Sequence, residues 1–365
     1  MSKLNVAVVF GGRSAEHEVS VQSAKNVFDS LDKNKYNPVL IAIDREGHWF
    51  YGGAVAELLD KNNSELIQLN RESNPEAALI SGREGGKLID LHNNKTISDI
   101  DVVFPVLHGP YGEDGSIQGL AKLADLPCVG AGILGSSISM DKDVMKRLLR
   151  DSGISIGDFL VFRRNEKIDF DMVFDRLGSP LYVKPANLGS SVGISRAAER
   201  DALKKAVGLA FEYDTKIIIE KNITGREIEV SVLGNLDPLA SIPGEIAPKD
   251  GFYSYDSKYL NETGASLIIP ARLSGEEQSE IQETAIRVYK TLCVSGMARV
   301  DLFFTKEGEI FVNEINTLPG FTKISMYPKL WKESGISYAE LVDRLIELAI
   351  EEFSVRTDLK TSIFG

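Results

Sequence analysis

The stretch FVNEINTLPG, residues 311–320, has the apolar content of a β-strand but carries two polar side chains on one face. Val312 and Ile315 are apolar, as expected of a strand that packs on a core. Glu314 and Asn316 are two positions apart, and side chains at that spacing project from the same face of a strand. A face with a carboxylate beside an amide either meets water or binds a cation.

The residues before this stretch predict the other strand of a β-hairpin. MARVDLFF (297–304) and EIFVNEIN (309–316) are separated by TKEG, in which Glu307–Gly308 is a candidate two-residue turn. This turn would place Phe303 opposite Val312 across the hairpin. Because side chains alternate with a period of two residues, a slip of one residue would change every pair.

In this register Asp301 lies opposite Glu314, and Arg299 lies opposite Asn316. Two carboxylates that face each other across strands repel and destabilise a sheet. A bound divalent cation reverses that effect, and two carboxylates with an amide oxygen suit Mg²⁺. The alternative is a solvated face on which Arg299 reduces the repulsion. We favour the metal site because the neighbouring residues are apolar and predict burial.

The composition is that of a folded globular protein, with 43% apolar and 26% charged residues in a chain of 365. This length predicts two or three domains. The net charge of −12 argues against nucleic acid or an anionic membrane as a partner. The chain starts with a strand-like stretch rather than a signal peptide, has no apolar run of about 18 residues, and places both cysteines in apolar contexts. We therefore expect a cytoplasmic protein.

The N-terminal part has the pattern of a βαβ unit. Apolar runs at 4–12 and 36–44 flank a segment of helical spacing, and a further buried strand is expected at 101–109. We therefore predict an N-terminal βαβ domain at residues 1–131.

The rest of the chain is expected to form two further lobes. Residues 132–223 contain helical segments and short hairpin-like pieces, whereas residues 224–365 contain longer strands with helices between and after them. Neither a sequence repeat nor a low-complexity linker separates the two. The predicted fold class is α/β, with α+β lobes.

The glycine-rich segment VKPANLGSSVGIS (183–195) is a candidate phosphate-binding loop. Lys184 precedes the loop, its glycines allow backbone amides to approach an anion, and Ser190 and Ser191 add hydroxyl donors. It is not a Walker loop, because GxxxxGK[ST] occurs nowhere in the chain. A glycine–serine hairpin without a ligand is the alternative.

Acidic residues follow two other predicted strands. Glu16 and Glu18 come after the glycines of the first strand, where they either complement a helix dipole or bind a substrate ammonium group. The GxGxxG dinucleotide fingerprint is absent there. Glu220 and Lys221 end the apolar strand IIIEK, where they either contact an adenine and ribose or simply leave the strand. The residues alone favour the structural alternative at both places.

A long polar segment, KDGFYSYDSKYLNETGAS (249–266), combines aromatic residues with Lys258 and resembles a lid over a phosphate group. His17 and His108 lie in predicted loops, and single histidines of this kind are more often structural than catalytic.

Taken together, the motifs of this chain resemble those of the D-alanine–D-alanine ligase family within the ATP-grasp superfamily. They occur in order from residue 11 to residue 328 and comprise GGRSAEHEVS, LHGPYGEDGSIQG, SMDK, KPANLGSSVG, EKNITGRE, YSYDSKY, RVD and NEINTLPGFTKISMYP. Each motif is weak alone, whereas the ordered set is specific. The resemblance implies a three-lobed ATP-grasp architecture with an N-terminal βαβ (pre-ATP-grasp) domain, and ATP held between two lobes.

The resemblance also implies ATP and Mg²⁺ as cofactors, with two metal ions and Mn²⁺ as a possible substitute. The implied nucleotide-binding residues are Lys142, Lys184, Glu220, Lys221, Ile223, Glu227 and Lys258. The implied metal ligands are Asp301, Glu314 and Asn316, in agreement with the hairpin register.

Further residues match the family's catalytic and substrate-binding groups. The implied catalytic set, with Arg299 and the Gly320 amide as oxyanion donors, is Glu16, Ser190, Tyr259, Arg299 and Gly320. The implied substrate-binding residues, with Glu16 at the first ammonium group, are Glu16, His108, Ser325 and Met326.

The implied reaction joins two D-alanine molecules through an acyl phosphate for peptidoglycan precursor synthesis, in a homodimeric enzyme with no nucleic-acid or membrane partner. One alternative is a D-alanine–D-lactate ligase, but related enzymes with that preference replace the tyrosine that matches Tyr259. Another alternative is a non-catalytic nucleotide-binding protein, against which stand the intact Asp301, Glu314 and Arg299.

Overall fold

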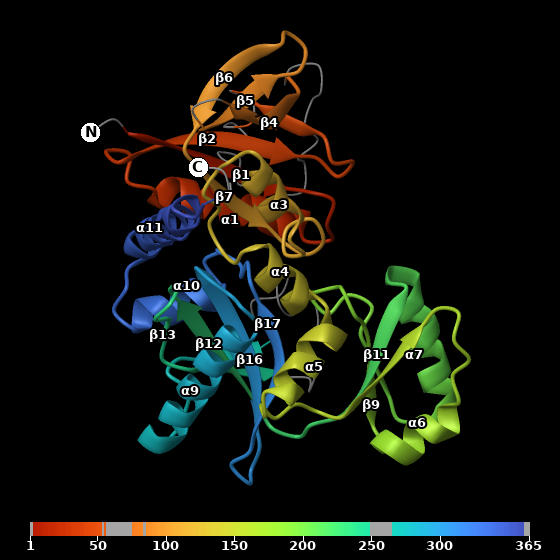
Figure 1. The fold of residues 1–365 in the computed structure, drawn as a ribbon. Helices are drawn as coiled ribbons and strands as arrows, with labels where there is room; N and C mark the ends of the chain where they lie inside the picture. Colours follow the sequence, from red (N-terminus) through yellow and green to blue (C-terminus); the bar gives the residue numbers. More distant parts are fainter. Residues whose placement is uncertain (1–2, 53–54, 56–74, 83–84, 249–264, 361–365) are drawn as a thin grey trace.

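The computed structural model describes residues 3–52, 55, 75–82, 85–248 and 265–360. In this part of the chain the strands form four sheets, with helices packed around them. Figure 1 shows three lobes, with the red and orange N-terminal elements at the top, the green elements at the lower right and the blue elements at the lower left. The prediction of an α/β fold with mixed lobes is confirmed.

The N-terminal lobe is built on the predicted βαβ unit. Its elements are β1 (Leu4–Gly11), α1 (His17–Ser30), β2 (Tyr36–Ile43), β3 (Trp49–Tyr51), β4 (Ala77–Gly82), β5 (Gly85–Asp90), β6 (Lys95–Ile100), β7 (Val102–Leu107) and α3 (Ser116–Leu123). The first sheet has the order β3-β2-β1-β7, with β1 parallel to both β2 and β7. Strands β4, β5 and β6 form a separate antiparallel sheet. Since β1 is covered on both faces, its apolar residues follow one another without alternation.

The second lobe holds an antiparallel sheet of order β10-β9-β11-β8. Its elements, with the two helices that lead into it, are α4 (Ile133–Met140), α5 (Lys142–Asp151), β8 (Phe159–Arg163), α6 (Phe170–Leu177), β9 (Leu181–Pro185), β10 (Ser195–Ala197), α7 (Arg200–Tyr213) and β11 (Lys216–Lys221). Helices α6 and α7 share a hydrophobic core with this sheet. The opposite side of β9 and β11 is left for α5 and for the cavities described below.

The third lobe is built on an antiparallel sheet of order β15-β14-β12-β16-β17, in which β13 also pairs with β12. Its elements are β12 (Arg226–Leu233), β13 (Leu239–Ala240), β14 (Gly244–Pro248), β15 (Ala265–Ile268), α9 (Gly275–Thr291), β16 (Met297–Phe304), β17 (Ile310–Asn316), α10 (Met326–Glu333) and α11 (Tyr338–Thr357). Alternate residues of β12, Ile228, Val230 and Val232, are fully buried in one core with α9. The intervening residues Glu227 and Glu229 therefore point to the other face, which is the polar one.

Helix α11, near the C-terminal end of the described chain, packs against the N-terminal lobe. Val27 of α1 and Leu345 of α11 belong to one buried cluster with residues of β1 and β7. Figure 1 shows α11 beside the N-terminal sheet. The same helix also contacts the end of β12, since the Asn235 side-chain amide donates to the Leu348 carbonyl at 3.1 Å. The first and third lobes therefore share a core, which fixes the N-terminal loops relative to β16 and β17.

The β16–β17 hairpin has the predicted pairs at its functional end. Arg299 pairs with Asn316, and Asp301 pairs with Glu314. Beyond Asp301 the register shifts, and Phe303 pairs with Phe311. The predicted pairing of Phe303 with Val312 is therefore wrong.

The predicted two-residue turn at Glu307–Gly308 is also wrong. The backbone N–H of Thr305 donates to the carbonyl of Glu309 at 3.0 Å, which closes a three-residue loop. Gly308 in this loop has φ of 82°, a conformation that favours glycine. The extra loop residue shifts the register of the hairpin by one. A β-bulge at Asn313 of β17, between the pairs Leu302–Val312 and Asp301–Glu314, shifts it back, so the pairs at the functional end are the predicted ones.

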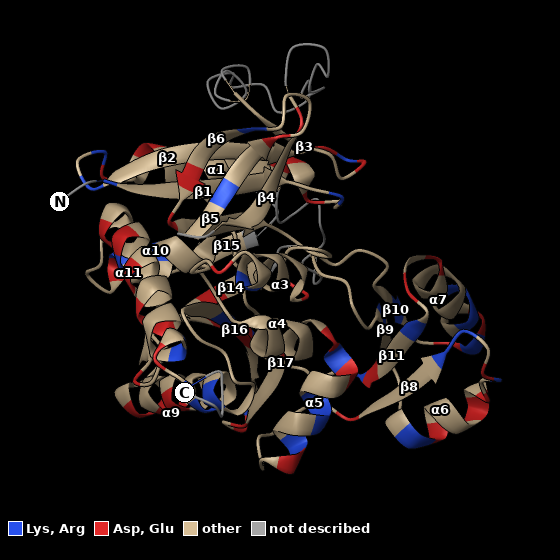
Figure 2. Cartoon of the chain, turned by 45° about the horizontal axis from the view of Figure 1, so that its top comes forward, with Lys and Arg blue, Asp and Glu red and all other residues tan. Residues whose placement is uncertain are grey.

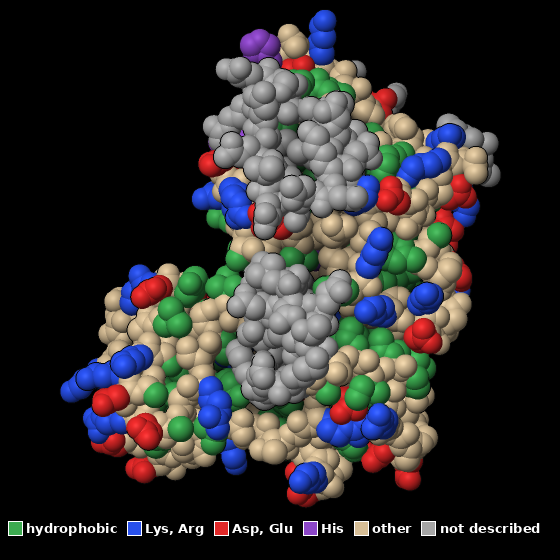
Figure 3. All heavy atoms as spheres, turned by 180° about the vertical axis from the view of Figure 1, so that it is seen from behind, with side chains coloured by type: hydrophobic (Ala, Val, Ile, Leu, Met, Phe, Trp, Pro, Cys, Tyr) green, Lys and Arg blue, Asp and Glu red, His purple; other side chains and the backbone are tan. Residues whose placement is uncertain are grey.

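The charged residues are distributed over the outside of the described structure. Figure 2 shows blue and red segments recurring along α5, α6, α7, α9 and α11. On the face drawn in Figure 3, positive and negative side chains are interspersed. Among the described helices, none combines the length and the apolar composition needed to cross a bilayer.

We predict that Gly308→Ala destabilises the protein by about 1 kcal/mol, because an L side chain in the left-handed region costs this much per residue. Space is not limiting, since no atom lies within 4 Å of the added Cβ. The measurement is the denaturant midpoint, with Glu307→Ala in the same loop as the control. Equal midpoints for the two variants would contradict the loop assignment.

Candidate active site

Two cavities meet where the three lobes converge. The first has a volume of ≈ 80 Å³ and lies between the N-terminal loops, α4, the glycine-rich loop and the third lobe. The second has a volume of ≈ 310 Å³ and lies between the sheets of the second and third lobes. Gly189, Ser190, Glu229 and Glu314 line both cavities. Because the two cavities share these lining residues, a molecule bound in one would lie next to a molecule bound in the other.

The structure gathers nearly all of the described residues that we singled out at this junction. The first cavity is lined by Glu16, Lys142, Ser190, Arg299, Glu314, Asn316, Gly320, Ser325 and Met326. The second is lined by Lys184, Ser190, Glu220, Lys221, Ile223, Glu227, Asp301 and Glu314. Lys258 and Tyr259 lie outside the described residues, as does most of the segment expected to form a lid.

Three carboxylates lie in one row across adjacent strands. Glu229 of β12 pairs with Asp301 of β16, which pairs in turn with Glu314 of β17. Only the second and third were identified from the sequence. Glu229 was missed, although its spacing from Glu227 already placed it on the polar face of an alternating strand.

Two cations reach this row from different lobes. Arg299 is bidentate to Asp301, with Nε to Oδ1 and Nη2 to Oδ2 both at 2.7 Å. The Nζ of Lys142, at the start of α5, lies 3.7 Å from Oε2 of Glu314. These ion pairs offset the repulsion that the row of carboxylates would otherwise cause.

The donor atoms of the row suit a hard divalent cation. Carboxylate and amide oxygens are the ligands that Mg²⁺ takes from proteins, and it usually keeps waters or phosphate oxygens besides. Asp301 and Glu314 supply carboxylates, and the Asn316 amide oxygen accepts one bond from the Leu318 N–H at 3.1 Å, which leaves it a second lone pair. Asp301 and Glu314 line the second cavity, so a metal bound to them would also contact a molecule in that cavity.

A buried carboxylate holds two lysines at the inner end of the larger cavity. Glu220 of β11 pairs with Lys184 of β9 at 2.6 Å and with Lys146 of α5 at 2.8 Å. Burial alone would raise the pKa of Glu220, but the two lysines lower it to about 2. Burial lowers the pKa of Lys146, whereas Glu220 keeps the pKa of Lys184 above its ordinary value despite burial. Glu220 therefore stays ionised between the two amines.

Lys146 and Asn313 were not identified from the sequence. Lys146 follows Lys142 by four positions, and this spacing puts both on one side of α5, so the helix pattern contained the signal. Asn313 precedes Glu314 and should point to the opposite face of a regular strand. At the bulge its Oδ1 instead accepts from Lys184 Nζ at 3.1 Å, and the residue lines the larger cavity.

The glycine-rich loop has an unusual backbone next to Glu16. Ser190 and Ser191 have φ of 52° and 61°, which few residues other than glycine adopt. Lys142 Nζ donates to the Leu188 carbonyl at 2.6 Å and thereby ties the loop to α5. A Cβ added to Gly189 would lie 3.8 Å from Glu16 Oε2, so the loop closely approaches the carboxylate of the first lobe.

His108 does not line either cavity, in contrast to the implied substrate contact. It is buried at the end of β7, where Nδ1 lies 3.1 Å from the Leu318 carbonyl and 3.8 Å from Glu113 Oε1. Burial alone would lower the pKa of His108, but Glu113 and Glu16 raise it overall. Glu113 lines the first cavity and was not identified, although it belongs to the glycine-rich GEDG stretch.

Gly320 and Ser325 form a tight turn at the start of α10. A Cβ on Gly320 would lie 2.7 Å from Ser325 Oγ, so any side chain at this position would displace the Ser325 hydroxyl. Ser325 Oγ accepts from the Thr322 N–H at 3.0 Å, and Met326 begins the helix. The helix therefore presents its N-terminal end, which favours anions, at the first cavity.

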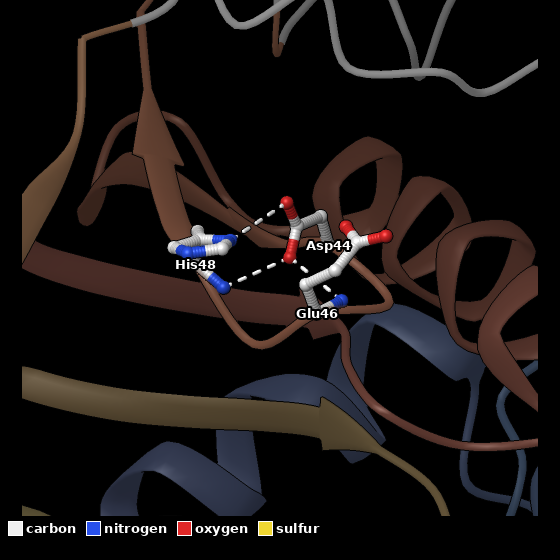
Figure 4. A group of neighbouring side chains, drawn as sticks. All are labelled: Asp44, Glu46 and His48. Atoms are coloured by element: carbon white, nitrogen blue, oxygen red, sulfur yellow. Dashed lines mark hydrogen bonds and ion pairs between the residues drawn. The ribbon is translucent and has the colours of Figure 1, made fainter.

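A second acidic cluster lies in the turn between β2 and β3. Asp44, Glu46 and His48 are close together, as Figure 4 shows. Asp44 Oδ1 accepts from the backbone N–H groups of Glu46 and His48 at 2.9 and 2.8 Å, and Oδ2 lies 3.2 Å from His48 Nδ1. We assign this cluster to the stabilisation of the turn.

We predict that Glu220→Gln lowers the free energy of unfolding by about 3 kcal/mol at pH 7, the value of a pKa held about 2.5 below its ordinary one. Because the pKa is depressed in the folded state, this contribution is present above about pH 4.5 and is lost as the pH falls toward 2. The difference between the thermal midpoints of the two proteins, measured from pH 7 to 3, should shrink as the pH falls below about 4.5. Glu212→Gln, exposed on α7, is the control. A difference independent of pH would refute the assignment.

Comparison with known proteins agrees with this arrangement. Residues 5–131 match the family described as "D-ala D-ala ligase N-terminus", and residues 148–347 match "D-ala D-ala ligase C-terminus". A protein of Shouchella clausii named D-alanine–D-alanine ligase is 52% identical over 366 aligned residues, covering 100% of this chain and 99% of its own length.

Solved structures agree as well. The D-alanine-D-alanine ligase of Coxiella burnetii superposes with a TM-score of 0.86 at 38% identity, covering 98% of this chain and 97% of that one. The Bacillus anthracis ligase complexed with ATP gives a TM-score of 0.73 at 30% identity, with 97% and 99% covered. This chain has the ATP-grasp fold and belongs to the D-alanine–D-alanine ligase family.

Proposed function

We propose that this protein uses ATP to ligate two D-alanine molecules into D-alanyl-D-alanine for peptidoglycan precursor synthesis. The observation that carries the proposal is the junction of two cavities at Ser190, Glu229 and Glu314. The larger is of the size of ligand pockets, and the smaller suits an amino acid as small as alanine. The membership of the family supports the same reaction.

The larger cavity would hold ATP. Glu220, Lys221, Ile223 and Glu227 line it along the connection from β11 to β12, and we assign them to the adenine and ribose. Lys184 and Lys142 lie on the side of the glycine-rich loop, and we assign them to the phosphates, joined by Lys258 from the segment outside the described residues. The pairing of Glu220 with Lys184 would hold that lysine extended and charged for the phosphate.

Asp301, Glu314 and Asn316 would hold two Mg²⁺ ions, for which Mn²⁺ is a possible substitute. When bound, the metals would neutralise charge on the phosphates as it develops during transfer. Glu314 lines both cavities, so it is the ligand best placed to keep the γ-phosphate beside the amino acid. Lys142, 3.7 Å from Glu314, would add a positive charge at the same place.

In the first step the carboxylate of one D-alanine attacks the γ-phosphorus of ATP, which forms an acyl phosphate and releases ADP. In the second step the amine of the other D-alanine attacks the acyl carbon and loses a proton, and phosphate leaves. The residues of the first cavity fit both steps. We assign Glu16 to the first ammonium group, with His108 behind it, and Ser325 and the Met326 amide to the second carboxylate.

Arg299 and the Gly320 backbone amide line the first cavity and are proposed to stabilise the oxyanion of the tetrahedral intermediate. Ser190 and Glu16, with Tyr259, are proposed to close the site by hydrogen bonding the lid to the glycine-rich loop. We also propose that Tyr259 makes the enzyme prefer D-alanine to D-lactate as the second substrate, so that the product is the dipeptide.

We further propose a homodimer in the cytoplasm, where ATP is supplied, and domains that divide after residues 131 and 223. A sedimentation measurement would test the dimer. A non-catalytic role in nucleotide binding is disfavoured, since Arg299 and the Gly320 turn serve the smaller cavity rather than the nucleotide.

We predict that the purified protein with ATP, Mg²⁺ and D-alanine releases phosphate and forms a product with the mass of D-alanyl-D-alanine. The measurement pairs a phosphate assay with mass spectrometry, and L-alanine is the control substrate. Phosphate release that does not depend on D-alanine would contradict the proposal. With equal D-alanine and D-lactate at neutral pH, a dominant depsipeptide mass would refute the specificity alone.

We predict that Glu314→Gln lowers kcat at least about 100-fold, because the transition state loses a metal ligand. The affinity for ATP without metal should change by less than about 2-fold, since the adenine and ribose contacts lie elsewhere. Calorimetry measures the binding, and Glu309→Gln, exposed in the same hairpin, is the control. Wild-type turnover in Glu314→Gln would refute the metal assignment.

A further inference from the structure

Glu229 has no role in the mechanism above, although it borders both cavities. It lies on β12 and is buried, with 7% of the residue exposed. Its neighbour in the row is Asp301, directly opposite on β16. A carboxylate buried beside a second carboxylate is unfavourable unless a cation stabilises it, so its contacts indicate its role.

Glu229 forms an ion pair with Arg299. Oε2 of Glu229 lies 3.0 Å from Nε of Arg299, and the same Nε lies 2.7 Å from Oδ1 of Asp301. The guanidinium therefore lies between two carboxylates. It donates two hydrogen bonds to Asp301 on its own strand and forms an ion pair with Glu229 of the neighbouring strand.

The two carboxylates differ in what else they would bind. Asp301 lies opposite Glu314 and belongs with it to the proposed metal site. A metal there would attract the Asp301 oxygens and repel the guanidinium, which weakens the bidentate pair. Asp301 lies between Glu229 and Glu314 in the row. Glu229 therefore approaches Arg299 from the side away from Glu314.

We propose that Glu229 is a positioning residue that keeps Arg299 directed at the reacting carbonyl oxygen once the metal engages Asp301. This inference rests on the proposed function. Glu229 acts through Arg299 and not through the nucleotide or the metal. Its loss therefore affects the chemical steps and leaves the binding of the metal–nucleotide complex unchanged.

The test compares Glu229→Gln with Glu245→Gln. The control also removes the charge from an Arg–Glu pair of the same sheet, because Glu245 of β14 is bidentate to Arg226 at 3.0 and 2.7 Å. Glu245 lines neither cavity. We expect kcat of Glu229→Gln to fall about 10- to 100-fold, the usual effect of losing a group that orients a catalytic side chain. Glu245→Gln should stay within about 2-fold of the wild type.

Two measurements separate positioning from metal binding. The kcat deficit of Glu229→Gln should persist at saturating Mg²⁺. By calorimetry, its affinity for Mg²⁺ with a non-hydrolysable ATP analogue should stay within about 2-fold of the wild type. Recovery of kcat at high Mg²⁺, or a large loss of affinity, would overturn the proposal in favour of a metal ligand.

A double-mutant cycle tests the route through Arg299. In an Arg299→Lys background, Glu229→Gln should lower kcat by less than about 2-fold further, because residues that act as a unit are not additive. Additive losses would overturn the proposal. If Glu229→Gln does not fold, Glu229→Asp, which keeps the charge but draws it back, should lower kcat without changing metal–nucleotide affinity, and wild-type kcat would overturn the proposal. Failure of the wild type to ligate D-alanine would instead refute the proposed function.

Discussion

The mutual repulsion of Glu229, Asp301 and Glu314 is the constraint on which the rest of the site depends. Three neighbouring strands place these carboxylates in one row, and repulsion between them has to be offset by positive charge. Arg299 comes from within the sheet, whereas Lys142 comes from α5, at the edge of the second lobe. The row therefore links the sheet of one lobe to a helix of the next, and it is where we propose that a divalent cation binds.

In the second lobe, the helix and the sheet that carry the lysines of the site are joined by direct contacts. Asp141 caps the N-terminus of α5 by accepting from Val144, and its other oxygen contacts Lys216 of β11. The Lys142 N–H donates to the Ala186 carbonyl at 3.0 Å, just after β9. Helix α5 is thereby fixed to the sheet that carries Lys184. These contacts bring Lys142, Lys146 and Lys184 to one side of the cavities, where we propose that the phosphates bind.

The sequence predicted those parts of the fold and site that depend on local periodicity. The βαβ unit follows from apolar runs, and the Asp301–Glu314 pair follows from alternation along two strands. That pair was obtained through two compensating errors, in the turn and in the strand, so agreement at one end of a hairpin does not establish the register at the other. Asn313 could not be predicted, because a β-bulge is set by the packing of both strands rather than by the residue itself.

Other residues and strands were missed because their sequence patterns were present but not distinctive. Glu229 and Lys146 follow known site residues at strand and helix spacing, yet a carboxylate in a strand or a lysine in a helix is usually solvated, and only burial distinguishes these two. The sheet of β4, β5 and β6 was not read from sequence because short, partly polar strands lack a strong period. The role of His108 depends on its contact with Leu318, which is 210 positions away.

The net charge of −12 makes a site for a polyanionic nucleotide a local problem. Four cations of the junction are paired with acids: Lys146 and Lys184 with Glu220, Lys142 with Glu314, and Arg299 with Asp301 and Glu229. The effect is clearest at Lys184, where Glu220 keeps the pKa of the amine above its ordinary value although burial alone would lower it. In the function that we propose, phosphate oxygens of a metal–nucleotide complex would replace the acids as partners of the lysines, and Asp301 and Glu314 would bind the metal. Positive and negative groups of the site would then change partners together, so that the local charge stays balanced, and Arg299 would retain its ion pair with Glu229.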